Sequence, residues 1–172
     1  MAKTGPYTKK VIECFRNPKN YGKMKNPDGI GKVGNPVCGD VMWLYIKVEK
    51  DKKGREILGD IKFETFGCVA AIATSSVITD LAMGKTLETA LKIDKTKIVN
   101  SLGGLPPIKL HCSVLAAEAL SEAVYDYLKK KGREISEELQ ERHKRAEATR
   151  RGIEEKYKDW TDIEEKAHKK RK

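Results

Sequence analysis

Three cysteines stand in sequence contexts that favour metal binding: Cys38 in NPVCGD, Cys68 in FGCVAA and Cys112 in KLHCSV. Asp40 follows the first of them by two residues, and His111 directly precedes the third. Thiolate, imidazole and carboxylate groups bind zinc and iron, and thiolates also hold iron-sulfur units. Five donors for about four coordination positions predict a metal site whose ligands can exchange.

The spacing of the cysteines does not by itself define this site. The three thiols are 30 and 44 residues apart, unlike the CxxC pairs of local zinc knuckles. Each one taken alone is also compatible with a buried small hydrophobic residue, which is what many free cysteines are. For Cys14, on the apolar face of a predicted first helix, we expect that structural role.

His111 and Cys112 could instead be the base and nucleophile of a cysteine-dependent hydrolase. The side chains of adjacent residues on a helix point about 100° apart and do not face each other. Adjacent positions are therefore unfavourable for a base and its nucleophile. We therefore expect Pro106 and Pro107 to keep His111 outside the helix, with Cys112 at the helix start. Cys68 and Cys112 are both predicted at helix N-termini, where the helix dipole favours thiolate over thiol.

The segments that must position these residues alternate between strand and helix signals. Residues 26–40 hold four glycines and two prolines and are predicted to be mostly turn and loop. Two β-branched and aromatic runs, 41–49 and 56–66, predict an antiparallel hairpin. Helical patterns cover 8–16, 69–83, 86–91, 94–102 and about 112–130. We expect an α+β fold: a small antiparallel β-sheet of about three strands, packed on one side by several helices.

Beyond Gly132 the composition shifts to Glu, Lys and Arg with few apolar residues. The apolar residues that remain recur every seven positions, as Leu139, Ala146, Ile153, Trp160 and Ala167. This predicts a charged helical extension with one narrow apolar seam, lying on its own domain or on a neighbour. We expect a scaffold domain at 1–130 and the extension at 131–172.

The charge of the chain does not favour a nucleic-acid partner. The formal net charge is +10, but the excess is divided evenly between residues 1–128 and 129–172, with no basic cluster outside the terminal HKKRK. Nucleic-acid binders usually concentrate basic residues on one face.

No apolar run approaches the length of a membrane span, and no apolar segment follows the opening MAKTGPYTKK, so we expect a cytoplasmic protein without disulfides.

NPVCGDVM, FETFGCVAAIATSS and LPPIKLHCSVLA, in that order, resemble the IscU/NifU-type iron-sulfur cluster assembly scaffolds from about Val11 to Leu128. The resemblance implies that Cys38, Cys68, His111 and Cys112 bind a nascent [2Fe-2S] cluster or Zn²⁺. It also implies that Asp40 is an initial Fe²⁺ ligand and keeps the cluster labile. Cys112 would accept persulfide sulfur from a cysteine desulfurase, and apo Fe-S proteins would receive the cluster. Such a protein is a scaffold and not an enzyme.

The segment LPPIK matches the motif by which family members are recognised by a dedicated Hsp70 and its J-protein; it comprises Leu105, Pro106, Pro107, Ile108 and Lys109. From the residues alone, it is equally a rigid spacer that aims His111 and Cys112. The resemblance also implies an electron donor and leaves open a homodimer that shares the cluster.

One departure qualifies the resemblance. The family usually has Gly-Ser after its second cysteine, whereas this chain has Val69-Ala70, which we expect to narrow solvent access to Cys68.

The second hypothesis for the function is a structural zinc protein that uses the same Cys and His ligands. A structural site needs four closed ligands and gains nothing from Asp40.

Overall fold

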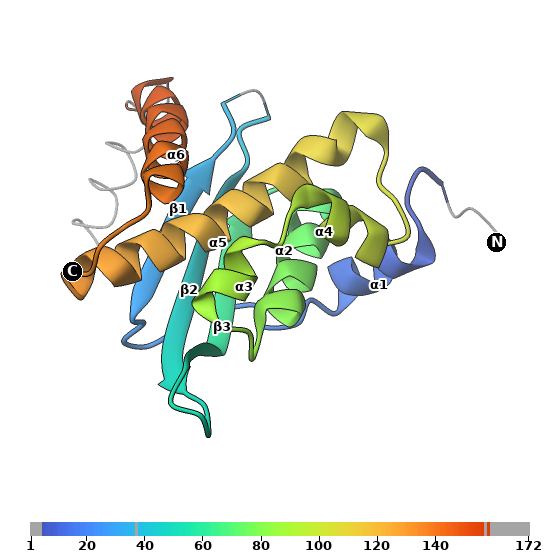
Figure 1. The fold of residues 1–172 in the computed structure, drawn as a ribbon. Coiled ribbons are helices and arrows are strands. Elements are labelled where there is room, and N and C mark those ends of the chain that lie inside the picture. The colour runs from blue at the N-terminus through green and yellow to red at the C-terminus, as the bar shows by residue number, and fades with distance from the viewer. Residues whose placement is uncertain (1–4, 37, 157, 159–172) are drawn as a thin grey trace, which may run out of the picture.

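The computed structural model describes residues 5–36, 38–156 and 158 (Figure 1). Its centre is a three-stranded antiparallel sheet in the order β1 (Gly29–Gly34), β2 (Val41–Lys50), β3 (Glu56–Phe66). The helices are α1 (Lys9–Arg16), α2 (Val69–Ala82), α3 (Leu87–Leu91), α4 (Lys95–Ser101), α5 (Leu110–Lys130) and α6 (Glu137–Lys156), with a 3-10 turn η1 at Pro107–Lys109. The expected α+β fold with helices on one side of a three-stranded sheet is confirmed.

The sheet presents one apolar face to the helices. Along β2, the side chains of Met42, Leu44 and Ile46 alternate inward and are fully buried, and Phe63 of β3 is buried beside them. Successive residues of a strand point to opposite faces, so this alternation gives β2 one core face. The long helix α5 packs across β1 and β2, and α2 packs beside α5 and against β3.

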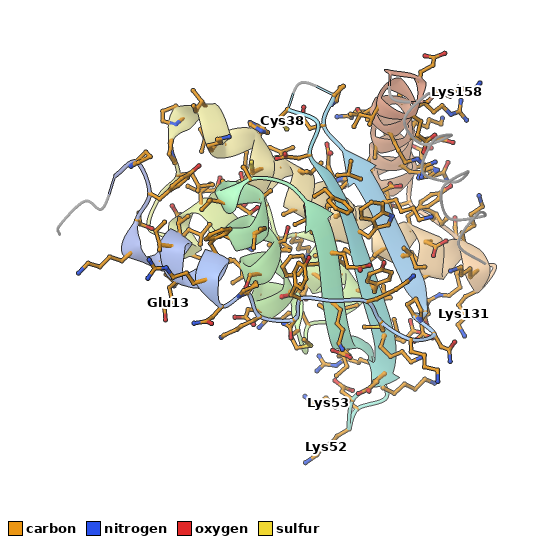
Figure 2. The ribbon with its side chains drawn as sticks, turned by 180° about the vertical axis from the view of Figure 1, so that it is seen from behind. Glu13, Cys38, Lys52, Lys53, Lys131 and Lys158 are labelled. Atoms are coloured by element: carbon orange, nitrogen blue, oxygen red, sulfur yellow. The ribbon has the colours of Figure 1, made fainter. Side chains whose placement is uncertain are left out.

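The opposite face of the sheet is crossed by residues 17–28, which lead from α1 to β1 (Figure 2). This segment is held by backbone hydrogen bonds at both of its ends. The Phe63 N–H donates to Asn20 O at 3.0 Å, and the Gly22 N–H donates to Phe63 O at 2.8 Å. Near β1, the Asp28 N–H donates to Ile46 O at 2.8 Å.

The strand β1 lies inside the segment that was predicted to be loop, so that prediction was wrong for Gly29–Gly34. Its glycines are there because a helix backbone passes over them. A Cβ atom at Gly31 would lie 2.8 Å from Ala123 N of α5 and would overlap the carbonyl of Ala119. Glycine inside a strand often marks a place where another backbone approaches closely.

The start of α5 also differs from the expectation. The 3-10 turn at Pro107–Lys109 runs directly into the helix at Leu110, because proline is well tolerated in a first helical turn. His111 therefore lies inside the first turn of α5, and not in a non-helical lead-in. The prediction that Cys112 stands close to the helix start is confirmed.

The extension forms α6, which packs on α5 and β1 (Figure 1). Three members of the predicted seam are buried in this contact: Leu139, Ala146 and Ile153. Trp160 and Ala167 lie outside the described residues. Within the part of the chain that the structure describes, no helix is long and apolar enough to cross a membrane.

Candidate metal site

The five predicted donors meet at one end of the sheet, where three segments converge. These are the link between β1 and β2, the N-terminus of α2 and the N-terminus of α5. One ligand atom from each of Asp40, Cys68 and Cys112 lies within 4.8 Å of the others, and the same holds for Cys38, Asp40 and His111. Asp40 belongs to both groups and so joins them.

The distances inside this cluster suit a small metal centre. The Cys68 and Cys112 Sγ atoms are 3.8 Å apart, and each is 3.9 Å from Asp40 Oδ2. Two thiolates on one tetrahedral ion with metal-sulfur bonds of about 2.3 Å are themselves about 3.8 Å apart. The protein therefore holds this sulfur pair at the separation that a shared ion requires.

The site is buried at its base and open at its rim. Cys112 is 1% exposed and Asp40 is 7% exposed, whereas Cys38 is exposed. Cys68 and His111 are half-buried. Figure 2 shows Cys38 at the end of the sheet opposite the turn that carries Lys52 and Lys53. The Cys38 side is therefore the open side of the site.

A compact turn presents Cys38 and Asp40. The Asn35 N–H donates to Asp40 O at 2.9 Å, and the Gly39 N–H donates to Asn35 O at 2.8 Å. Gly39 has φ +73°, a left-handed conformation that glycine adopts without strain. The cysteine and the aspartate are thus held by backbone hydrogen bonds on a turn that closes the β1–β2 hairpin.

The absence of a side chain at Gly67 leaves space for the Asp40 carboxylate. A Cβ atom at this position would lie 3.3 Å from Asp40 Cγ and 2.6 Å from Ala71 Cβ. Cys68 follows as the N-cap of α2, and its side chain makes no capping hydrogen bond. Its sulfur is therefore turned to the cluster and not to the helix end.

His111 and Cys112 approach each other although they are neighbours on one helix. The His111 Nε2 atom lies 3.5 Å from Cys112 Sγ, against the expectation that adjacent residues on a helix cannot face each other. The imidazole is long enough for its Nε2 atom to reach back to the sulfur of the next residue. Cys112 is supported from behind, where Thr74 Oγ1 donates to its carbonyl at 3.2 Å.

The Cys112 thiol is not activated in the way that its position at a helix N-terminus suggests. Burial raises the pKa of the Cys112 thiol, and the adjacent Cys68 raises it further. Partial desolvation also raises the pKa of the Cys38 thiol, although the residue as a whole is exposed. At Cys112, desolvation therefore outweighs the helix dipole, and the positive charge of a bound metal would favour the thiolate form of this residue.

Two further residues lie beside the cluster. Tyr7 was not identified from the sequence, and Lys109 was identified only as part of the LPPIK segment. Tyr7 packs against the small apolar cluster of Ala70, Ala71 and Cys112, and burial and then Cys68 raise the pKa of its hydroxyl. The pKa of Lys109 is raised mainly by Cys68, which places a cation near that thiol. No local sequence pattern marks Tyr7, because its position depends on how α1 packs against α2.

The segment 105–109 has one buried and one exposed side. Leu105 packs against the apolar wall of the site, whereas Ile108 is 78% exposed. Next to it, Leu110 and Val114 are also partly exposed on α5. Leu105 therefore packs as expected for a rigid spacer, whereas Ile108 is an apolar side chain exposed at the surface.

Comparisons with known proteins find relatives of this chain. The family model described as NifU-like N terminal domain matches residues 6–134. The chain is 54% identical, over 127 residues, to a protein of Archaeoglobus fulgidus named iron-sulfur cluster assembly scaffold protein IscU 1, covering 74% of this chain and 80% of that protein. It is 50% identical over 129 residues to the iron-sulfur cluster assembly scaffold protein IscU of Azotobacter vinelandii, covering 73% and 97%.

The fold is also similar to that of a solved structure. The crystal structure of a nitrogen-fixing NifU-like protein (N-terminal) from Brucella abortus superposes with a TM-score of 0.56 at 19% identity, covering 73% of this chain and 96% of that chain.

Proposed function

Because this chain belongs to the NifU-like N-terminal domain family, we propose that it is a scaffold on which iron and sulfur are assembled into a [2Fe-2S] cluster for transfer to apo-proteins. One observation carries the proposal. The three cysteines, His111 and the Asp40 carboxylate meet at one half-open site, which is one donor more than a closed four-coordinate ion uses.

Sulfur enters as a persulfide from a cysteine desulfurase. The Cys112 sulfur attacks the terminal sulfur of the donor persulfide, the donor's S–S bond breaks, and the donor leaves as a thiolate that takes the Cys112 proton. Since burial raises the pKa of Cys112, bound Fe²⁺ assists by stabilising its thiolate form. Reduction of the persulfide sulfur to sulfide draws electrons from Fe²⁺ and from an electron-donor protein.

Asp40 binds the first iron and later makes the cluster easy to release. A carboxylate is a hard oxygen ligand that suits Fe²⁺ better than it suits a sulfide-bridged cluster. Its position 3.9 Å from the sulfurs of Cys68 and Cys112 supports both roles. His111 and Cys38 complete the ligand set, and Zn²⁺ occupies the same donors when iron and sulfide are absent.

The exposed rim supports a set of protein partners. Ile108 is available to the peptide groove of an Hsp70, and Leu105 and Lys109 lie on the same segment. Apo Fe-S proteins and the desulfurase approach from the Cys38 side. A homodimer that shares the cluster through this open side is compatible with the exposure of Cys38.

The structural zinc protein is the second candidate function. It is favoured by the burial of Cys112 and by the Cys68–Cys112 sulfur separation, which fit one tightly held ion. It gives no role to Asp40, whose carboxylate nevertheless lies between the two groups of donors.

Cluster transfer separates the two candidates. The protein loaded anaerobically with iron and sulfide is mixed with an apo-ferredoxin, the two are separated, and the ferredoxin is examined by visible circular dichroism. A scaffold hands its cluster over within minutes, and the signal moves to the ferredoxin. A structural zinc protein leaves the ferredoxin without a cluster.

A further inference from the structure

The helix α6 reaches the loop that presents two of the donors. It begins at Glu137, after the last residue matched by the family model, and runs alongside β1 at the edge of the sheet (Figure 1). Ile153, near its C-terminal end, is 8% exposed. Its Cδ1 atom sits so close over Gly34 that a Cβ atom there would overlap it.

Gly34 is the last residue of β1 and forms the base of the turn that carries Cys38 and Asp40. It pairs with Val41, the first residue of β2, and the next residue, Asn35, donates its N–H to Asp40 O at 2.9 Å. A Cβ atom at Gly34 would lie 3.5 Å from Asp40 O. Ile153 therefore presses on the backbone of this turn within one residue of its closing hydrogen bond.

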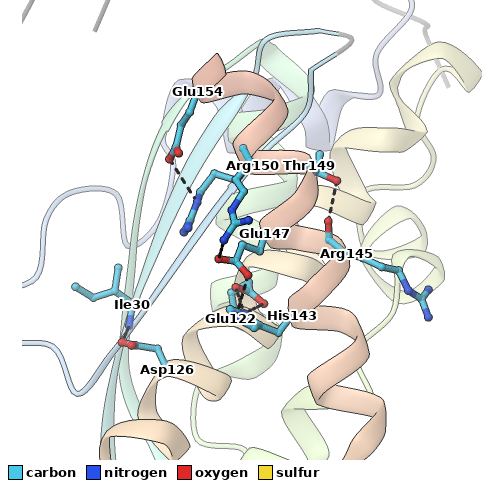
Figure 3. A network of polar contacts seen from close by, with 10 residues as sticks. Ile30, Glu122, Asp126, His143, Arg145, Glu147, Thr149, Arg150 and Glu154 are labelled. Atoms are coloured by element: carbon cyan, nitrogen blue, oxygen red, sulfur yellow. Dashed lines mark hydrogen bonds and ion pairs between the residues drawn. The ribbon is translucent and has the colours of Figure 1, made fainter. Parts of the chain in front are cut away.

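The rest of α6 is anchored firmly enough to hold Ile153 in place. The buried Glu122 carboxylate of α5 lies 2.9 Å from His143 Nδ1 (Figure 3). The His143 imidazole also stacks on the Tyr125 ring with a centroid separation of 3.8 Å. Arg142 donates to Leu91 O at 3.3 Å. These contacts join α6 to α5 and to the end of α3, independently of the contact at Gly34.

We propose that α6 is a positioning element for the metal site: Ile153 packs on Gly34, restrains the turn that carries Cys38 and Asp40, and so slows the loss of bound metal. This inference rests on the proposed metal site but not on cluster assembly. Ile153 touches no donor atom and acts through the backbone between Gly34 and Asp40.

A one-methyl change tests the contact. Ile153→Val removes Cδ1, the atom nearest to Gly34, and keeps the rest of the side chain. Amide exchange of Asn35 and Gly39 in the metal-free protein is measured by NMR, and release of Zn²⁺ from the loaded protein is followed with a chromophoric chelator. We expect both rates to rise about 2- to 10-fold, the range that loss of one buried methyl group produces.

Ile135→Val is the matched control. It deletes the same methyl group from a partly buried isoleucine just before α6, whose first residue lies about 24 Å from Ile153 along the helix axis. Neither rate should change by more than about 1.5-fold, because the change lies beyond the contacts that anchor α6. Equal acceleration in both variants would mean that α6 only contributes general stability and would overturn the proposal.

A double substitution tests the coupling directly. Gly34→Ala adds the Cβ atom that overlaps Ile153 Cδ1, so it should speed amide exchange at Gly39 and Zn²⁺ release. In Gly34→Ala/Ile153→Val the overlapping atom is gone, and both rates should fall back toward those of Ile153→Val. Additive effects would overturn the proposal. If the amide-exchange rates change as expected but the wild-type protein forms no cluster, the scaffold function is rejected and the positioning role of α6 stands.

Discussion

The sulfur atoms of Cys68 and Cys112 lie 3.8 Å apart although 44 residues separate them in the chain. They meet because α2 and α5 pack side by side with their N-termini at the same end of the sheet. The link between β1 and β2 brings Asp40 to within 3.9 Å of both sulfurs. The proposed metal site is therefore a product of helix packing, and its stability is coupled to that of the domain.

The cysteines should differ sharply in their importance for metal binding. Replacing Cys68 or Cys112 with Ala removes one of the paired thiolates and should weaken Zn²⁺ binding more than about 100-fold. Competition with a chelator of known affinity measures this change. Cys14→Ala is the control, because Cys14 packs against the core and not in the site, and its affinity should match that of the wild type.

Removing the Asp40 carboxylate should make the cluster more persistent. Asp40→Ala loaded with iron and sulfide should keep its visible absorption at least about 3-fold longer than the wild type after desalting, because the hard oxygen ligand is gone. Asp60→Ala, on β3 and outside the site, is expected to behave as the wild type. Loss from Asp40→Ala at the wild-type rate or faster would remove this role for Asp40.

Two glycines should respond to alanine in opposite directions. Gly31→Ala places a Cβ atom against the backbone of α5 and should destabilise the protein by about 1–3 kcal/mol in urea unfolding. Gly152→Ala, inside α6 with nothing within 4 Å, should be stabilising by about 0.5–1 kcal/mol through helix propensity. If the two variants shift the midpoint equally, the packing of α5 on β1 is not as described.

Glu56 should contribute a pH-dependent share of stability. Its pKa is lowered first by the hydrogen bond from Tyr127 and then by Arg133, with Tyr127 Oη donating to Glu56 Oε1 at 2.6 Å. A carboxyl with a lower pKa in the folded state binds its proton more readily when unfolded. Its stabilisation is therefore complete above the unfolded value of about 4.3 and is lost as the pH falls through the folded pKa.

Urea unfolding at several pH values checks this sign. Glu56→Gln should be about 0.5–1 kcal/mol less stable than the wild type at pH 7, and the gap should close as the pH falls below about 4. Glu88→Gln, in an exposed pair with Lys92, is the control and should show little difference at any pH. If the stability difference between the wild type and Glu56→Gln grew as the pH fell, the lowered pKa of Glu56 in the folded state would be contradicted.

Much of the site could be predicted from the sequence because its donors have distinctive chemistry. Cys38, Asp40, Cys68, His111 and Cys112 were identified by residue type and local context, and the structure brings all of them together. Helix and strand patterns also predicted β2, β3 and α2 within a few residues. These features depend on local sequence, where side-chain periodicity is informative.

The remaining features depend on contacts that no local pattern encodes. The glycines of β1 resemble turn residues until α5 is seen to pass over them. His111 enters the helix because the 3-10 turn after Pro106 continues into α5. The raised pKa of Cys112 follows from burial, which becomes visible only when Cys68 and the apolar wall are in place.

Anaerobic reconstitution of the metal-free protein with Fe²⁺ and sulfide tests the scaffold assignment most directly. Visible absorption, with iron and sulfide analysis of the desalted protein, should reveal sulfide-to-iron charge-transfer bands and equal amounts of iron and sulfide, both absent from Cys112→Ala. No charge-transfer bands, together with one tightly held zinc ion that iron and sulfide cannot displace, would contradict the scaffold function and leave a structural zinc protein.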